Sequence, residues 1–173
     1  MRSLILGGAR SGKSALAERI ATETGFDVVY IATAHAGDVE MQERIAHHRS
    51  RRPSHWRSIE ESMSVATALR DSASEARVVL VDCMTLWLSN LLTDPDETRL
   101  ERERDALLDV LPALPGHIVL VSNEVGLGIV PMGALTRRFV DEAGRLHQAI
   151  AQRCDRVLFV AAGLPLALKG TYE

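Results

Sequence analysis

A glycine-rich stretch, GGARSGKS at residues 7–14, most restricts what this chain can fold into. It follows the apolar run Ser3–Leu6 and precedes a segment in which Leu16 and Ile20 lie one helical turn apart. Glycines at such a strand-to-helix turn let backbone N–H groups converge on phosphate oxygens, and the helix N-terminus adds partial positive charge. The pattern G-x-x-x-x-G-K-[ST] in this setting predicts a site for the phosphates of a nucleotide.

Residues in and beyond this loop have distinct expected roles. Lys13 is expected to reach the terminal phosphates and Ser14 to ligate Mg²⁺. Asp82 ends an apolar run and is the expected acidic partner of the metal, directly or through water, although an Asp there also suits a helix N-cap. Glu124 follows another apolar run and is a second carboxylate that can join the site. The loop residues expected to bind phosphate are Gly7, Gly8, Ala9, Arg10, Ser11, Gly12, Lys13 and Ser14.

Apolar runs recur along the chain with helix-like segments between them. The runs are Ser3–Leu6, Asp27–Thr33, Arg77–Asp82, His117–Ser122 and Arg156–Ala161. Their apolar character is continuous, which is typical of parallel strands buried on both faces. The helical period appears at Lys13–Glu23, Asp38–His48, Ser62–Ser72, Thr85–Leu92, Glu97–Leu111 and Ala134–Arg153. We therefore expect an α/β fold with a mostly parallel sheet of about five strands flanked by helices, in one domain over residues 1–173.

Composition excludes several classes of protein. The chain has 173 residues, of which 46% are hydrophobic, and a net charge of −3, which argues against nucleic-acid binding. No run of eighteen apolar residues occurs and the N-terminus passes at once into the glycine turn, so we expect no membrane insertion and a cytoplasmic location. Cys83 and Cys154 lack the spacing of a zinc site or disulfide framework and are expected to be buried thiols.

Histidines and arginines cluster within residues 38–60. In a helix over Asp38–His48, His48 shares a face with Met41 and Ile45 and points inward, whereas His47 lies nearer solvent. A neutral imidazole can attack a phosphorus atom and form a covalent phosphoramidate. The simpler interpretation is that His48 is a partly buried histidine with its hydrogen bonds satisfied.

The residues that follow the histidines favour an anionic ligand. Arg49, Arg51 and Arg52 come directly after them, and guanidinium groups suit phosphate. Trp56 and Glu60 are expected to complete the pocket, the carboxylate accepting hydrogen bonds from a base edge or ribose.

Seven blocks of sequence together resemble one known family. They are GGARSGKS, YIATA, EMQERIAHHRSRRPSHWRSIE, VDCMTLWLSNLL, VSNEVGLGIVP, RRFVDEAGRLHQAIA and GLPLALKG. The chain resembles the bifunctional adenosylcobinamide kinase/adenosylcobinamide-phosphate guanylyltransferases of cobalamin biosynthesis, whose fold is of the P-loop NTPase type. The paired histidines followed by basic residues are not shared with ordinary small-molecule kinases.

The resemblance implies a two-step reaction. A nucleoside triphosphate phosphorylates adenosylcobinamide, and GMP from GTP is then transferred to that phosphate, which releases pyrophosphate and gives adenosylcobinamide-GDP. GMP passes through a guanylylated histidine, here His47 or His48, and helical phase favours His48. The implied substrates are GTP and ATP with Mg²⁺, and the implied assembly is a trimer. Beyond the loop, the implied nucleotide site takes in Ala32, Thr33, Ala34, Arg49, Ser50, Arg51, Arg52, Glu60 and Asp82.

One position departs from the family pattern, and two other functions stay open. Where the family has Gly-x-x-Asn-Gln, this chain reads GRLHQ, with His147 in place of asparagine. Both side chains hydrogen-bond, so we expect the change to be tolerated. The alternatives to the bifunctional enzyme are a simple P-loop kinase for a small metabolite and a GTP-binding switch without transfer activity.

Overall fold

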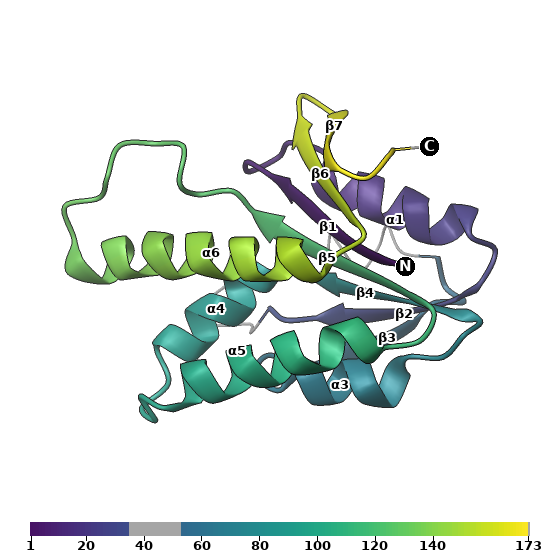
Figure 1. Ribbon diagram of the computed structural model, residues 1–173, viewed down its shortest axis with the longest axis horizontal. Helices are drawn as coiled ribbons and strands as arrows, with labels where there is room; N and C mark the ends of the chain where they lie inside the picture. Colours follow the sequence, from purple (N-terminus) through teal and green to yellow (C-terminus); the bar gives the residue numbers. More distant parts are fainter. Residues whose placement is uncertain (35–52, 173) are drawn as a thin grey trace.

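A central sheet organises the computed structural model, which describes residues 1–34 and 53–172 (Figure 1). The sheet has seven strands in these ranges, in the order β3-β2-β4-β5-β1-β6-β7. All neighbouring pairs are parallel except β6 and β7. The strands are β1 (Arg2–Gly7), β2 (Asp27–Ala32), β3 (Arg57–Glu60), β4 (Arg77–Asp82), β5 (His117–Asn123), β6 (Arg156–Ala161) and β7 (Leu164–Lys169). The expected mostly parallel α/β fold is confirmed.

The expected number of about five strands is wrong, because the two edge strands were missed. β3 is a four-residue polar strand, RSIE, that pairs only with β2 in the described sheet. β7 contains Pro165 and forms a hairpin with β6 across Ala162 and Gly163, both of which have positive φ. β3 has no apolar run, and the apolar run of β7 is interrupted by a proline and is mostly exposed, so neither segment has the buried pattern of the other five.

Helices follow the predicted periodicity closely in the described ranges. They are α1 (Lys13–Glu23), α3 (Val65–Ser72), α4 (Met84–Leu92), α5 (Arg99–Val110) and α6 (Ala134–Arg153), with a 3₁₀ turn at Leu111–Ala113. α1 and α6 have the expected bounds, and the other three differ by at most three residues. The helix expected over 38–48 lies outside the described residues. None of the helices described here combines the length and apolar character needed to cross a membrane.

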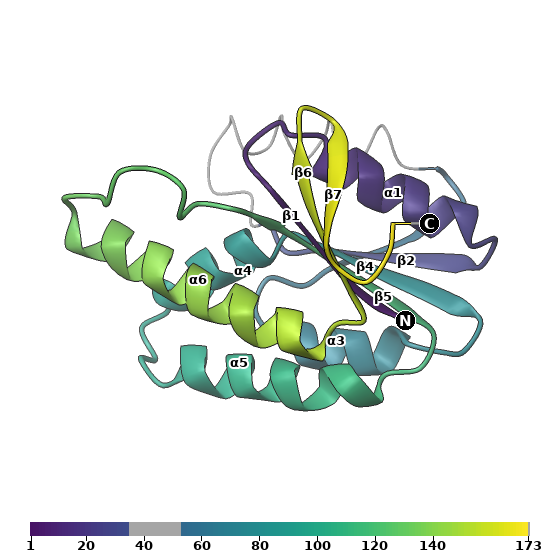
Figure 2. The ribbon, with the colours of Figure 1, turned by 45° about the horizontal axis from the view of Figure 1, so that its top comes forward.

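The helices cover the two faces of the sheet unequally. α1 lies on one face, whereas α3, α4, α5 and α6 lie on the other (Figures 1 and 2). Leu16 of α1 packs in a buried cluster with Leu80 of β4. The next residue of that strand, Val81, belongs to the core on the opposite face. Because adjacent side chains of one strand enter different cores, both faces of the central strands are buried.

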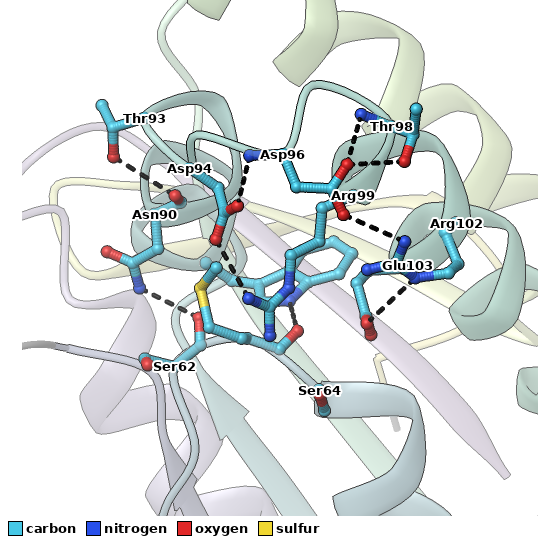
Figure 3. Close-up of polar contacts among 12 residues, drawn as sticks. Ser62, Ser64, Asn90, Thr93, Asp94, Asp96, Thr98, Arg99, Arg102 and Glu103 are labelled. Atoms are coloured by element: carbon cyan, nitrogen blue, oxygen red, sulfur yellow. Dashed lines mark hydrogen bonds and ion pairs between the residues drawn. The ribbon is translucent and has the colours of Figure 1, made fainter.

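α4 fixes the carboxyl end of β2. The side-chain amide of Asn90 donates hydrogen bonds to the carbonyl oxygens of Thr33 and Ser62, both at 3.0 Å. Figure 3 shows Asn90 turned toward Ser62, beside the Arg99–Asp94 ion pair of 3.0 Å that joins α5 to the end of α4. One helix therefore holds two separate segments at the edge of the sheet where the parallel strands end.

Candidate active site

The glycine-rich loop connects β1 to α1 at the carboxyl edge of the sheet. A Cβ on Gly7 would lie 2.5 Å from the carbonyl oxygen of Val160, which is backbone and cannot rotate away. Gly12 has φ +97°, a conformation that side chains of L-residues rarely adopt. The N–H of Ser11 donates to the carbonyl of Gly8 at 3.2 Å and closes the turn. The glycines at 7 and 12 are therefore required by the loop geometry itself.

The side chain of Lys13 folds back onto the loop that precedes it. It is only 8% exposed, and its ammonium group donates a 3.1 Å hydrogen bond to the carbonyl of Gly8. Burial lowers the pKa of Lys13, and the negative charge of Asp82 partly opposes that shift. An ammonium group has three donors, so this cation can contact a phosphate while keeping its bond to the loop.

The loop also holds a hydroxyl group that has no partner in the part of the chain that the structure describes. The Oγ of Ser11 is buried and, among the described residues, makes no hydrogen bond. Buried polar groups are normally satisfied, so this oxygen suits a bound phosphate or water. The carbonyl of the same residue accepts a 2.8 Å hydrogen bond from the N–H of Gly163, which ties the loop to the β6–β7 turn.

Asp82 ends β4, separated from β1 by β5 alone. Its Oδ2 accepts a 2.9 Å hydrogen bond from the phenol of Tyr30, a buried residue of β2. No cluster of three or more metal-ligating side chains occurs within 1–34 and 53–172. Mg²⁺ in nucleotide sites is bound through one or two protein oxygens plus phosphates and water, so Asp82 with the hydroxyl of Ser14 fits that requirement.

Buried and partly buried hydrogen bonds connect the ends of neighbouring strands. The hydroxyl of Thr33 donates to the carbonyl of Cys83 at 2.7 Å and accepts from its N–H at 2.8 Å. The hydroxyl of Thr85 accepts from the backbone N–H of Asn123 at 3.3 Å. Thr33, expected to bind nucleotide, thus has its hydroxyl engaged with the end of β4, while its neighbours Ala32 and Ala34 are half-buried.

Glu124, Ser122 and His147 form a further polar group beside the loop. The N–H of Glu124 donates to the carbonyl of Gly7 at 3.0 Å, and its Oε1 accepts a 2.6 Å hydrogen bond from the N–H of Gly126. Nε2 of His147 lies 2.7 Å from the hydroxyl of Ser122, and its Nδ1 lies 3.7 Å from Oε2 of Glu124. Burial lowers the pKa of His147 more than Glu124 raises it, so the imidazole is neutral at pH 7.

The other expected site residues divide into two groups. Glu60 is paired in register with Ala32 and is exposed at the same edge as Asp82, whereas Trp56 is buried in the core on the α1 side. The second group lies outside the described residues and comprises His47, His48, Arg49, Ser50, Arg51 and Arg52. Sequence reasoning missed Tyr30, Thr85 and Asn123, although each lies in or just after a strand that reaches this edge.

Together the fold and the loop define a P-loop nucleotide-binding protein. Residues 3–168 match the family model described as cobinamide kinase / cobinamide phosphate guanyltransferase. The chain belongs to this family. A solved structure from Pyrococcus horikoshii OT3 aligns with a TM-score of 0.52 over 99% of this chain and 87% of that one, at 11% identity, which is a likeness of fold alone.

Two named relatives match along nearly their whole length. The bifunctional adenosylcobalamin biosynthesis protein CobP of Pseudomonas aeruginosa is 65% identical over 170 residues, which cover 98% of both chains. The bifunctional adenosylcobalamin biosynthesis protein CobU of Escherichia coli is 38% identical over 98% of this chain and all of its own.

Proposed function

We propose that this chain is a bifunctional cobinamide kinase and cobinamide phosphate guanylyltransferase, with residues 1–173 as one catalytic domain. The observation that carries the proposal is the family match over residues 3–168, which includes a phosphate loop with Lys13 buried beside Asp82. The first reaction phosphorylates the hydroxyl of adenosylcobinamide with a nucleoside triphosphate. The second transfers GMP from GTP to that phosphate and releases pyrophosphate.

In the first reaction the phosphate loop holds the triphosphate of the donor. Backbone N–H groups of the loop and the ammonium of Lys13 bind its phosphate oxygens. The half-buried Ser14 lies in the first turn of α1, whose N-terminus faces them. Ser14 and Asp82 would hold Mg²⁺, which when bound offsets charge on the transferring phosphoryl group. Tyr30 keeps the Asp82 carboxylate in one orientation through its hydrogen bond.

The second reaction is assigned to His48, with His47 as the alternative. Neutral imidazole attacks the α-phosphorus of GTP, pyrophosphate leaves, and the cobinamide phosphate then takes the GMP from the histidine. Support comes from the strand end that precedes this segment and from the end of the strand that follows it. Thr33 leaves β2 at the carboxyl edge, and Glu60 ends β3 at the same edge, so both flank the phosphate loop side of the sheet. Arg49, Ser50, Arg51 and Arg52 would line the triphosphate.

Labelled GTP tests the guanylylated histidine directly. We expect GMP on the protein through a bond that is labile in acid and stable in alkali, lost in His48→Ala and retained in His47→Ala. Mass mapping of the adduct identifies the residue. Labelling lost only in His47→Ala would move the nucleophile by one position, and no adduct during turnover would exclude a covalent route.

Two other functions predict different results in the same assay. A simple P-loop kinase would phosphorylate cobinamide or another small alcohol without forming a GMP adduct. A GTP-binding switch would bind GTP and transfer nothing. A cytoplasmic location and the absence of nucleic-acid binding remain proposals, tested by cell fractionation and by titration with duplex DNA.

A homo-oligomer, a trimer by resemblance, is proposed as the working assembly. Leu164, Leu166 and Leu168 alternate along the edge strand β7 and are all exposed, and Ile129 in the β5–α6 connection is 97% exposed. Exposed apolar side chains such as the leucines of β7 are typical of subunit contacts. Light scattering gives the mass in solution, and we expect Leu166→Glu to lower it.

A further inference from the structure

The carboxylate of Glu124 has a position that the fold itself does not require. It follows the last residue of β5, and its backbone N–H is bonded to Gly7, the first residue of the phosphate loop. Its side chain is 22% exposed at the carboxyl edge of the sheet. Asp82 stands at the end of the strand on the other side of β5 from β1. Two carboxylates therefore lie at the ends of the neighbouring strands β4 and β5, on the edge of the sheet that carries the nucleotide loop.

Each oxygen of the Glu124 carboxylate has a polar neighbour, but only the contact at Oε1 is a hydrogen bond. Oε1 accepts the N–H of Gly126 at 2.6 Å, and Oε2 faces Nδ1 of His147 at 3.7 Å. The other side of the His147 ring is hydrogen-bonded, because its Nε2 lies 2.7 Å from the hydroxyl of Ser122, which is fully buried. When the hydroxyl of Ser122 donates to Nε2, the proton of the neutral ring is on Nδ1, on the side of Glu124. This is an oriented carboxylate with lone pairs left for a substrate.

The two reactions differ in what they require of such a group. In the first, the acceptor is an alcohol, whose proton must be removed as its oxygen bonds to phosphorus. In the second, the acceptor is a phosphate oxygen that is already ionised at neutral pH, so no proton has to be taken from it. A carboxylate that serves as base is therefore needed in one reaction only.

We propose that Glu124 is the catalytic base of the phosphorylation reaction and that His147 is the residue that positions it. This rests on the proposed function. The alcohol oxygen bonds to the γ-phosphorus of the donor, the bond from that phosphorus to the bridging oxygen breaks, and the nucleoside diphosphate leaves. The alcohol proton passes to the Glu124 carboxylate and from there to solvent water.

Glu124→Gln tests the base by measuring the two reactions separately. Phosphorylation is assayed with adenosylcobinamide and ATP, and GMP transfer with adenosylcobinamide phosphate and GTP. We expect kcat of phosphorylation to fall about 100-fold with KM for ATP little changed, while GMP transfer is retained. Glu124→Asp, which keeps the carboxylate, should recover part of the loss. Glu75→Gln, at an exposed site away from this edge, is the matched control and should change neither rate.

His147→Leu, which leaves no polar group to face Glu124, tests the positioning role. We expect kcat of phosphorylation to fall about fivefold, the order of effect of one orienting polar contact, with GMP transfer unchanged. In the Glu124→Gln background the same substitution should add no further loss, because there is no base left to position. A merely structural effect would instead lower both reactions and would add to the loss caused by Glu124→Gln.

The outcomes separate the role of Glu124 from the proposed function. A folded Glu124→Gln variant that loses both reactions equally, or neither, overturns the assignment of the base while the proposed function stands. Circular dichroism and thermal unfolding establish that the variant is folded, and Glu124→Asp provides a second folded variant. A wild-type chain that performs neither reaction would overturn the proposed function and this inference with it.

Discussion

The backbone N–H of Gly163 donates a 2.8 Å hydrogen bond to the carbonyl oxygen of Ser11, so the turn between the last two strands holds the phosphate loop. The contact is close on the other side as well, since a Cβ on Gly12 would lie 3.1 Å from Cα of Gly163. Two backbone segments that are far apart in the sequence, at residues 11–12 and at Gly163, are therefore in direct contact. The shape of the loop depends on the β6–β7 hairpin as much as on its own glycines.

Gly163→Ala should weaken nucleotide binding. Gly163 has φ +77°, a strained conformation for alanine that costs about 1 kcal/mol and shifts the N–H that holds Ser11. Gly25→Ala is the matched control, because Gly25 has φ +70° and equally open space around a Cβ but lies beyond the end of α1. We expect similar losses of thermal stability and a lower affinity for GTP only in Gly163→Ala, measured by calorimetry. Equal affinities would show that the hairpin does not shape the loop.

Gly7→Ala and Gly8→Ala should differ strongly despite being adjacent. A methyl group on Gly7 would meet the backbone oxygen of Val160 at 2.5 Å, whereas one on Gly8 would meet nothing within 4 Å. Overpacking against rigid backbone lowers the free energy of unfolding by about 2–3 kcal/mol, and an uncrowded surface change by less than about 0.5 kcal/mol. Chemical denaturation gives both values, and equal stabilities would contradict the close approach of Gly7 to the backbone of β6.

Lys13→Met should lower activity and leave stability intact or improved. The ammonium group is buried and that burial lowers its pKa. Desolvation of this charge therefore lowers the free energy of unfolding. Removing it deletes a donor to the phosphates, and we expect both reactions to slow by about 100-fold or more. Arg70→Met, on the exposed side of α3, is the control for loss of a positive charge. A fall in melting temperature for Lys13→Met alone would show that the lysine is structural.

His147→Asn should make the protein less sensitive to mild acid. The pKa of His147 in the folded chain lies below the ordinary value of 6.5, so the unfolded chain binds more protons in the window between them. Stability is therefore complete above pH 6.5 and is lost as pH falls through that window, by at most about 1.4 kcal/mol per pH unit. We expect the variant to lose less, as measured by chemical denaturation at a series of pH values. The pKa of His117 is also lowered, but it is common to both proteins and cancels in the comparison.

Much of the fold was predictable because central strands and amphipathic helices carry strong periodic signals. The run RVVLVD is buried along most of its length, and its predicted bounds are those of β4. Edge strands lack such a signal: RSIE is mostly exposed, and its strand character comes from pairing with β2 rather than from its own residues. Tertiary pairing overrides local propensity at such positions.

The site was predictable where one motif contains all its parts. Lys13 and its loop follow from a contiguous pattern, and Asp82 from its place at a strand end. His147 could not be assigned a role in this way. Its sequence neighbours indicate a helix, but its contacts are with Ser122 of β5 and with Glu124, which follows that strand. Contacts between distant segments are set by packing, which no local pattern contains.

The position of β1 in the sheet has a consequence for synthesis of the chain. β1 carries the phosphate loop and is made before both of its partner strands, because Leu4 pairs with Leu120 of β5 on one side and Val157 of β6 on the other. When synthesis has just passed α5, neither partner strand has been made, and both edges of β1 are unpaired. The sheet around the phosphate loop is complete only after β6 has been made, so the loop is synthesised early relative to the strands that hold it and takes its final setting late.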